Sequence, residues 1–213
     1  TGTVLAPGSE GLSVVFTPTD STDYKSVTAT TTISVTTSAC VTTTENESLT
    51  VAKGTAACLE AGGKITGSIS VSSGGALWVT GGTIGGSLSS SGATAISISG
   101  ATVTGSVSVT GTTGPVLLGS DSIGGSISLS SNTGGLSLTS DHVTGSLSAS
   151  SNSAGVTMTG NTIGGSASVT SNTGGVTFTN NTIDGSLAIT KNSGVFTYSG
   201  NTVKGSVSNS GNT

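Results

Sequence analysis

Side chains that could carry out acid–base chemistry are few in this chain. The single histidine, His142, directly follows Asp141, and serines are abundant nearby, so a Ser-His-Asp triad is formally possible. Adjacent residues of an extended segment point to opposite sides, however, so Asp141 cannot easily orient the imidazole. We therefore predict that Asp141 and His142 are solvated corner residues and that the chain is not an enzyme.

A second candidate site is the pair of carboxylates on Asp121 and Asp141, which occupy equivalent positions 20 residues apart. Stacked on neighbouring strands they would lie about 4.8 Å apart, where two carboxylates repel unless one is protonated or a cation lies between them. A Ca²⁺ site completed by backbone oxygens is one interpretation. A glycosidase pair is disfavoured because no third acid and no basic residue lies nearby. We favour splayed, solvated aspartates without a cofactor.

The composition excludes several classes of protein. Charged residues make up 7% of the chain and hydrophobic residues 32%, which differs from the low hydrophobicity and high net charge of disordered chains. Five basic residues and a net charge of −4 make nucleic acid a poor partner. No apolar run approaches the roughly 18 residues of a membrane span, so we expect no membrane insertion.

A short repeat dominates the chain from Lys64 onward. The pattern is a polar residue, Ile or Val, any residue, then Gly-Ser, and it recurs every 19 or 20 residues. Its eight copies start at Lys64, Thr83, Thr102, Ser122, His142, Thr162, Thr182 and Thr202. Each repeat contains two stretches of alternating apolar and polar residues, such as 166–170 and 176–179, separated by turn residues. Because one repeat cannot bury its apolar face alone, the repeats must stack. We predict an all-β, right-handed parallel β-helix of about 7.5 coils over residues 64–213.

Three kinds of column follow from stacking the repeats. The apolar columns form the core; one of them is Ile65, Ile84, Val103, Ile123, Val143, Ile163, Ile183 and Val203. The glycine of each Gly-Ser pair occupies one corner, where we expect either a positive φ or no room for a Cβ. The asparagines of a second corner are expected to form an amide ladder: Asn132, Asn152, Asn172, Asn192 and Asn212.

The coil pattern resembles the right-handed parallel β-helices of bacterial surface proteins and the bactofilins. Residues 1–36 differ: the stretch Leu-Ser-Val-Val-Phe-Thr-Pro-Thr-Asp, ending at Asp20 and followed by Asp23-Tyr24, resembles the last strands of a bacterial immunoglobulin-like repeat. That family occurs in tandem on surface and secreted proteins, which implies an extracellular location. A complete sandwich needs about 100 residues, so these strands are expected to be truncated or completed elsewhere.

Residues 37–63 are expected to form an N-terminal cap pinned by a disulfide between Cys40 and Cys58, with two buried thiols as the alternative. No capping segment is evident at the other end, so we expect the solenoid to continue or to stack on a copy of itself. The chain has neither an initiator Met nor a signal peptide and is expected to be a piece of a longer protein.

Outward-facing rows of Ser and Thr suggest what the solenoid could bind. Three rows follow one strand, beginning at Ser68, Ser70 and Ser72, and two follow the other. On the second strand they include Ser137, Thr139, Thr157, Thr159, Thr177, Thr179, Thr197 and Ser199. These rows resemble the Thr-x-Thr faces of β-solenoid ice-binding proteins, although they can equally serve to keep a weakly charged solenoid in solution. Trp78 also points outward, as a sugar-stacking platform or as a contact with the cap.

Three functions are therefore expected, in order of preference. The first is a structural or adhesive module, displayed on a cell surface or built into a filament, whose partners are neighbouring domains, copies of itself or a host surface. The second is an ice-binding solenoid, and the third is a β-helix that binds or degrades polysaccharide.

Overall fold

A computed structural model describes residues 8–20, 22–35 and 40–213 of the chain. The chain divides into two units, Thr1–Ala39 and Cys40–Thr213. Throughout the described ranges the regular secondary structure is β-strand, and no helix long and apolar enough to cross a membrane is found there.

The first unit contains a two-stranded antiparallel hairpin. Strand β1 (Gly8–Phe16) pairs with β2 (Val27–Val35), from Gly8 opposite Val35 to Phe16 opposite Val27. Asp20 organises the connection, since its Oδ1 accepts hydrogen bonds from the backbone N–H groups of Thr22 and Asp23. A hairpin alone is marginally stable and does not make an immunoglobulin-like sandwich, whose further strands are not among the described residues. The residues before Gly8 lie outside those the structure describes.

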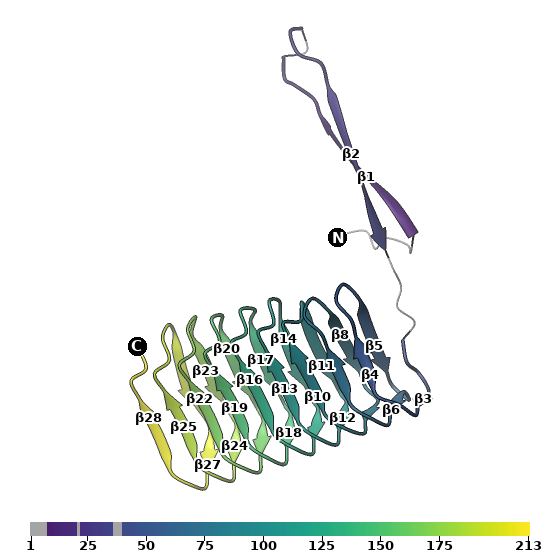
Figure 1. Cartoon of the computed structure of the whole chain (residues 1–213). Helices are drawn as coiled ribbons and strands as arrows, with labels where there is room; N and C mark the ends of the chain where they lie inside the picture. The colour runs from purple at the N-terminus through teal and green to yellow at the C-terminus, as the bar shows by residue number, and fades with distance from the viewer. Residues whose placement is uncertain (1–7, 21, 36–39) are drawn as a thin grey trace. The chain divides into compact units, whose positions relative to one another are not determined.

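The second unit is a parallel β-solenoid, as the repeat predicts (Figure 1). Each coil contributes one strand to each of three sheets, and every strand pairs in parallel with its equivalents in the coils before and after. Two sheets contain nine strands and one contains eight, so the solenoid has about eight coils. Its handedness stays a prediction.

Two of the three sheets are distinguished by their outward side chains, mostly Ser in one and largely Thr in the other, and the third consists of two-residue strands. The Ser sheet consists of β4 (Leu49–Val51), β7 (Ile69–Val71), β10 (Leu88–Ser91), β13 (Val107–Thr110), β16 (Ile127–Ser130), β19 (Leu147–Ser150), β22 (Ala167–Thr170), β25 (Leu187–Thr190) and β28 (Val207–Ser210). The Thr sheet consists of β5 (Ala56–Glu60), β8 (Ala76–Thr80), β11 (Ala95–Ser99), β14 (Val116–Gly119), β17 (Leu136–Thr139), β20 (Val156–Thr159), β23 (Val176–Thr179) and β26 (Phe196–Ser199). The short sheet consists of β3 (Thr44–Glu45), β6 (Lys64–Ile65), β9 (Thr83–Ile84), β12 (Thr102–Val103), β15 (Ser122–Ile123), β18 (His142–Val143), β21 (Thr162–Ile163), β24 (Thr182–Ile183) and β27 (Thr202–Val203).

The solenoid begins one coil earlier than the boundary at Lys64 that the repeat suggests. Strands β3, β4 and β5 pair in parallel with β6, β7 and β8, so residues 44–60 already form a coil. The expected disulfide is present: Cys40 is bonded to Cys58 of β5, with their Cα atoms 4.6 Å apart. The segment interpreted as a cap is thus itself the first coil, with its entry tied down by the disulfide.

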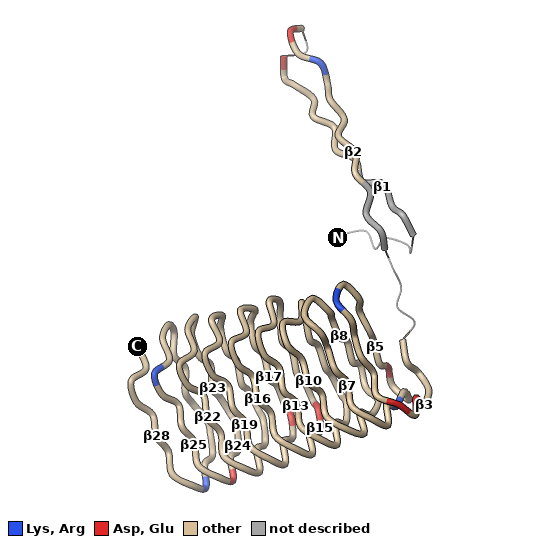
Figure 2. Tube along the Cα trace, in the orientation of Figure 1, with Lys and Arg blue, Asp and Glu red and all other residues tan. Residues whose placement is uncertain are grey.

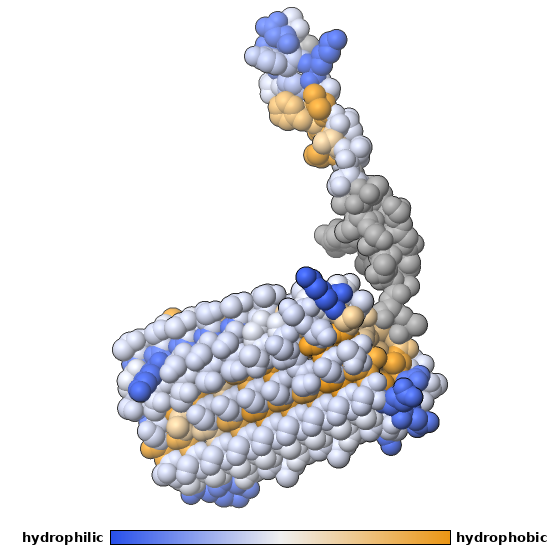
Figure 3. Space-filling view, viewed as in Figure 1, coloured by the Kyte–Doolittle hydropathy of each residue, from blue (hydrophilic) through white to orange (hydrophobic). Residues whose placement is uncertain are grey.

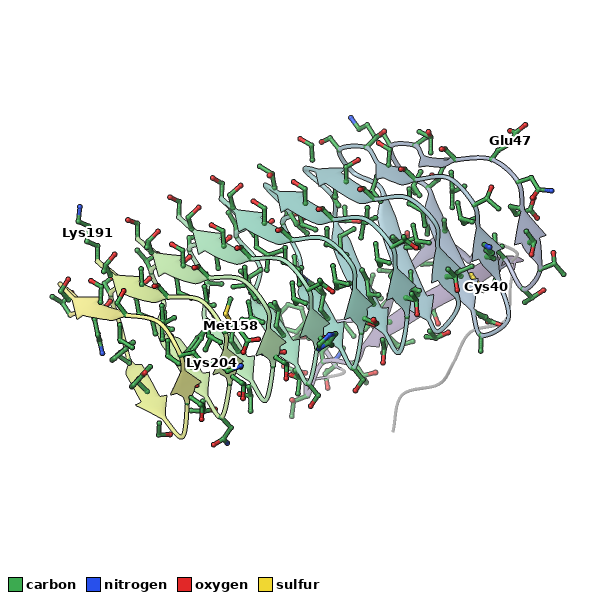
Figure 4. The ribbon with its side chains drawn as sticks, turned by 90° about the horizontal axis from the view of Figure 1, so that it is seen from below. Cys40, Glu47, Met158, Lys191 and Lys204 are labelled. Atoms are coloured by element: carbon green, nitrogen blue, oxygen red, sulfur yellow. A yellow bond between two sulfur atoms is a disulfide. The ribbon has the colours of Figure 1, made fainter. Side chains whose placement is uncertain are left out.

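The predicted apolar columns form the core. Their side chains are almost completely buried from Val51 to Ile189, and Met158 lies inside the coils (Figure 4). In the space-filling view, stripes of hydrophobic residues run along the solenoid between pale rows of Ser and Thr (Figure 3). The last coil differs from the prediction, because Val207 is 49% exposed and Tyr198 only partly buried. No further coil covers these two side chains in the structure.

The first corner, between the short sheet and the Ser sheet, contains the Gly-Ser pair. Here the Oγ of each Ser accepts a hydrogen bond from the backbone N–H of its equivalent in the next coil, as Ser146 Oγ does from Ser166 N. The N···O distances of this Ser ladder are 3.0–3.2 Å from Ser48 to Ser206. The hydroxyls of this row therefore already accept hydrogen bonds within the solenoid.

The Ser ladder explains the glycine that precedes each of its members. None of these glycines has a positive φ. A Cβ on Gly165 would instead overlap Ser146 Oγ of the preceding coil, and the same clash recurs at the other Gly-Ser pairs. The first coil has Glu47-Ser48 at this position, and within the described solenoid no coil precedes it that could place a Ser hydroxyl there.

The second corner, between the Ser sheet and the Thr sheet, contains the predicted Asn ladder. Asn172 is fully buried, and its Oδ1 accepts hydrogen bonds from both the backbone N and the Nδ2 of Asn152. Its own Nδ2 donates to the carbonyl oxygen of Ala149 at 3.0 Å and to Asn192 Oδ1 at 2.9 Å. Each amide thus satisfies buried backbone groups and joins three coils.

A left-handed residue precedes the asparagines and directs them inward. Ser131, Ser151 and Ser171 have φ values of 55–56°, a region that non-glycine residues seldom occupy. The positive φ expected at the Gly-Ser corner is thus found here instead, on serines. The inward hydrogen bonds of the following asparagine offset the cost of this conformation.

The Gly-Ser corner makes a prediction for Gly125. Gly125→Ala places a methyl group against Ser106 Oγ and 2.9 Å from the backbone of Gly105, so we expect a loss of about 1–3 kcal/mol in stability. Gly135 is the matched control, because it has open space around its Cβ position and no positive φ. Urea denaturation of both variants is the measurement. Equal unfolding midpoints for the two would contradict the proposed clash.

The Asn ladder makes a second prediction. Asn172→Ala leaves the N–H of Asn152 and the carbonyl of Ala149 buried without these partners, and each such group costs about 1–3 kcal/mol. We expect the variant to unfold at a markedly lower urea concentration, whereas Thr173→Ala at the exposed neighbouring position changes the midpoint little. A similar midpoint for both would show that the ladder does not stabilise the coils.

Candidate functional site

The middle of the solenoid has an almost uncharged surface. Between Ile65 and Ile183 the sequence contains no Lys, Arg or Glu, and its only ionisable residues are Asp121, Asp141 and His142. Figure 2 shows the other charged positions of the solenoid gathered toward its two ends. Because both aspartates are buried, His142 is the only ionisable side chain that this stretch exposes. Any ligand of this surface meets hydroxyl groups rather than charges.

The Thr-sheet residues singled out in the sequence lie together on one face. Thr157 is paired with Ser137 and Thr177, and Thr177 with Thr197, in one row. The second row is formed by Thr139, Thr159, Thr179 and Ser199. Thr159 Oγ1 and Thr179 Oγ1 lie 3.1 Å apart. Two regular rows of hydroxyl and methyl groups thus cross strands β17, β20, β23 and β26.

The Ser sheet is hollowed toward its N-terminal coils. A shallow depression of about 600 Å³ there is lined largely by hydroxyl side chains, namely Ser70, Ser72, Ser73, Ser89, Ser90, Ser91, Ser108 and Thr110, together with Val71. None of the lining residues is an acid or a base that could catalyse hydrolysis. Its chemistry suits contact with a neutral, hydroxyl-bearing ligand.

Trp78 and Leu117 interrupt the outward face of the Thr sheet. They are 44% and 42% exposed and lie in the same row, on either side of Ser97. Trp78 is also directly opposite Cys58, the disulfide-bonded residue of the first coil. This pairing places Trp78 next to the first coil, and its role as a sugar-stacking platform or as a contact with the N-terminal segment stays a prediction.

The carboxylates of Asp121 and Asp141 are buried, and the expectation of splayed, solvated side chains is wrong. Each is only 2% exposed. They lie at the third corner, between the Thr sheet and the short sheet, in a ladder that Asn161, Asn181 and Asn201 continue. Aspartate therefore occupies positions that asparagine fills in the later coils.

Both carboxylates accept backbone hydrogen bonds. Asp121 Oδ1 accepts from Ala101 N at 2.8 Å and its Oδ2 from Gly119 N at 3.0 Å, while Asp141 Oδ1 accepts from Asp121 N at 2.9 Å. Burial raises the pKa of both groups above their usual range. For Asp141 burial is the largest effect, the hydrogen bond from Asp121 N opposes it, and the nearby Asp121 carboxylate adds to it, giving a pKa of about 7.

The ladder geometry disfavours a calcium ion between the two aspartates. In the next coils the equivalent contact, from Asn161 Nδ2 to Asn181 Oδ1, spans 2.9 Å. Ca²⁺ holds each oxygen at about 2.3–2.6 Å, so two oxygens on opposite sides of an ion lie nearly 5 Å apart. No group of three or more His, Cys, Asp or Glu side chains suited to a metal occurs among the described residues. A calcium ion directly between two side chains stacked in this way would require this contact to lengthen to nearly 5 Å.

His142 and Asp141 face opposite sides of the chain, as expected from extended backbone. His142 is exposed at the start of β18, whereas Asp141 points into the corner and accepts its hydrogen bond from Asp121 N. The structure therefore does not bring them together as two members of a triad.

Sequence reasoning missed two features of these corners. One is the Ser ladder, whose hydroxyls were interpreted as a free outward row. The other is the burial of Asp121 and Asp141, although their 20-residue spacing from Asn161 gave a usable signal. A column shared by Asp and Asn indicates a role that the side-chain oxygen fulfils in every coil.

No protein-family model matches the chain, and no curated protein or solved structure is similar enough to count as a match. The fold and the ladders define the class, which is an all-β parallel solenoid with coils of about 20 residues.

Proposed function

We propose that the chain is a non-catalytic structural and adhesive module of a secreted or cell-surface protein. In this proposal the solenoid is a stiff scaffold that presents its Ser and Thr rows to another uncharged surface. The observation that carries the proposal is the division of polar groups. The corner amides and carboxylates are engaged internally, whereas the sheet faces expose hydroxyls and almost no charge.

Stiffness follows from the continuity of the corners. The Ser ladder runs along the whole solenoid, and from Ala101 onward side-chain ladders at the other two corners add to it, so the later coils are joined at all three corners as well as along three strands. A scaffold of this kind holds its surface groups at a fixed spacing of about 4.8 Å along the axis. Fixed spacing favours contact with another regular surface, such as a polysaccharide or a second solenoid.

The resemblance of the coil pattern to bacterial surface β-helices, and of the hairpin to an immunoglobulin-like repeat, supports an extracellular setting. The disulfide between Cys40 and Cys58 supports it too, because disulfides persist in oxidising compartments. Neighbouring domains of the same protein and further copies of the solenoid are the proposed structural partners.

Adsorption of the full chain to defined films tests the proposal. We expect binding to a cellulose film in a quartz crystal microbalance, with little dependence on salt because few surface charges take part. Two charge variants locate the contact: Thr157→Lys with Thr177→Lys on the Thr sheet, and Ser128→Lys with Ser148→Lys on the Ser sheet. We expect one of the two double variants to reduce adsorption at least tenfold and the other to leave it unchanged, which identifies the sheet that makes the contact. Release of soluble sugar, or no adsorption to cellulose, lipid or protein films, would contradict the proposal.

A second candidate function, ice binding, is favoured by one observation. The outward Thr residues of β20 and β23 are in register in both rows, and Thr159 and Thr179 are within hydrogen-bond distance of each other. Such an array can order water on a flat face. The exposed Trp78 and Leu117 restrict this face to the later coils.

Growth of single ice crystals in the presence of the protein tests this second function. We expect faceted crystals and a measurable thermal hysteresis for the unaltered chain, and loss of both when Thr177→Lys disrupts the face. Ser128→Lys on the Ser sheet is the control and should leave the activity intact. Round crystals without hysteresis would exclude ice binding.

A further inference from the structure

The ladder at the third corner changes chemistry along its length. In the asparagine coils the side-chain nitrogen donates two hydrogen bonds: Asn161 Nδ2 bonds to the carbonyl oxygen of Leu138 at 3.0 Å and to Asn181 Oδ1 at 2.9 Å. Asn181 repeats both bonds with Met158 and Asn201. Each amide therefore supplies two N–H groups to two buried acceptors.

Asp141 occupies the same position, but its side chain has no N–H group. Its Oδ1 accepts from Asp121 N at 2.9 Å, as Asn161 Oδ1 accepts from Asp141 N. Its second oxygen, Oδ2, therefore takes the place of the amide nitrogen. The 20-residue register puts the carbonyl oxygen of Leu118 and the Oδ1 of Asn161 at the positions of the two acceptors. Asp141 Oδ2 is completely buried and has no hydrogen-bond partner.

An ionised Asp141 would thus present a negative oxygen to two acceptors. The backbone N–H of Thr139 favours the charged form, but burial outweighs it. Burying a weakly hydrogen-bonded charge is costly, and the group responds by taking up a proton. A carboxylic acid has one O–H donor, and an O–H···O bond of about 2.5–3.0 Å fits the space that the N–H···O bond occupies in the next coil.

We propose that Asp141 is a neutral carboxylic acid in the folded solenoid, with its Oδ2–H replacing an amide N–H of the ladder, and that loss of this proton weakens the contact between coils at the third corner. The solenoid would then contain a pH-sensitive joint between the coils of Asp121 and Asn161, at the corner where both buried carboxylates lie.

The surroundings of Asp141 provide no counter-charge. The packed strands are β14, β15, β17, β18, β20 and β21, and their only ionisable residue is His142, whose side chain is exposed on the opposite side of the chain. Asp121 is the other ionisable group at this corner, and its negative charge opposes ionisation of Asp141. Asp121 Oδ2 accepts a hydrogen bond from Gly119 N at 3.0 Å, whereas the equivalent N–H of Thr139 has the smallest effect on the pKa of Asp141.

The pKa of Asp141 gives the direction of the pH dependence. Its value of about 7 in the folded chain exceeds the ordinary 3.8, so the folded state binds this proton more tightly than the unfolded state. The resulting stabilisation is fully present below about pH 4 and is lost as the pH rises through about 7. The solenoid is therefore expected to be more stable in mild acid than at pH 8.

Comparison of the full chain with Asp141→Asn tests the proposal. We expect the urea midpoint of the unaltered chain to fall between pH 5 and pH 8, while that of the variant changes much less and is higher at pH 8. Asp184→Asn is the control, because Asp184 is an exposed carboxylate paired with Lys204 at 2.8 Å, and it should retain the fall of the unaltered chain. An equal fall with pH in Asp141→Asn would overturn the proposal.

If Asp141→Asn does not fold, the protonation of Asp141 can still be measured directly in the unaltered chain. The side-chain carboxyl carbon of Asp141 can be followed by NMR in the unaltered chain across pH 3–9. We expect it to titrate near neutrality. Titration of Asp141 near pH 4 would show that it is ionised at neutral pH and would overturn the proposal whatever the behaviour of the variant.

Discussion

Most polar groups that the solenoid buries find their partners in the coil before or after them, and this requirement governs the whole structure. The backbone satisfies it along three parallel sheets. The turns satisfy it through side chains that repeat at the same interval, with Ser146 at one corner, Asn172 at the next and Asn161 at the third. A residue is acceptable at a corner only if its atoms complement those of its equivalents in the coils on either side. This rule explains the invariance of the Gly-Ser pair, since the glycine makes room for the preceding Ser hydroxyl.

The same rule shows why some features could be predicted from the sequence and others could not. Core columns, strands and the Asn132–Asn212 ladder follow from periodicity alone, because apolar residues and turn-forming amides have one dominant use in stacked coils. Asp121 and Asp141 were misassigned because a carboxylate at a corner suits solvent as well as a ladder, and the choice depends on which way the turn directs it. The first coil was missed because Glu47 stands where later coils have glycine, and glycine is required there only when a Ser hydroxyl of a preceding coil occupies the space.

The division between engaged and free polar groups also connects the fold to its proposed function. Amides and buried acids are engaged inside, and the sheet faces are left with small hydroxyl side chains and almost no charge. A surface of this kind has little long-range attraction for any partner. Its selectivity must come from the spacing and flatness of its rows, which differ between the Ser sheet, with its shallow depression, and the later coils of the Thr sheet.

The ladders also have a direction. Ser Oγ of one coil accepts from the coil that follows, and the Asn Nδ2 of one coil donates to the coil that follows, so a finished coil presents both an acceptor and donors to the next segment of chain. Residues that leave the ribosome first therefore form a template on which later residues can be ordered one turn at a time. If the coils stack in the order of synthesis, each glycine meets a Ser hydroxyl that is already in place. Folding can then proceed by addition at one growing end, without a search among distant segments.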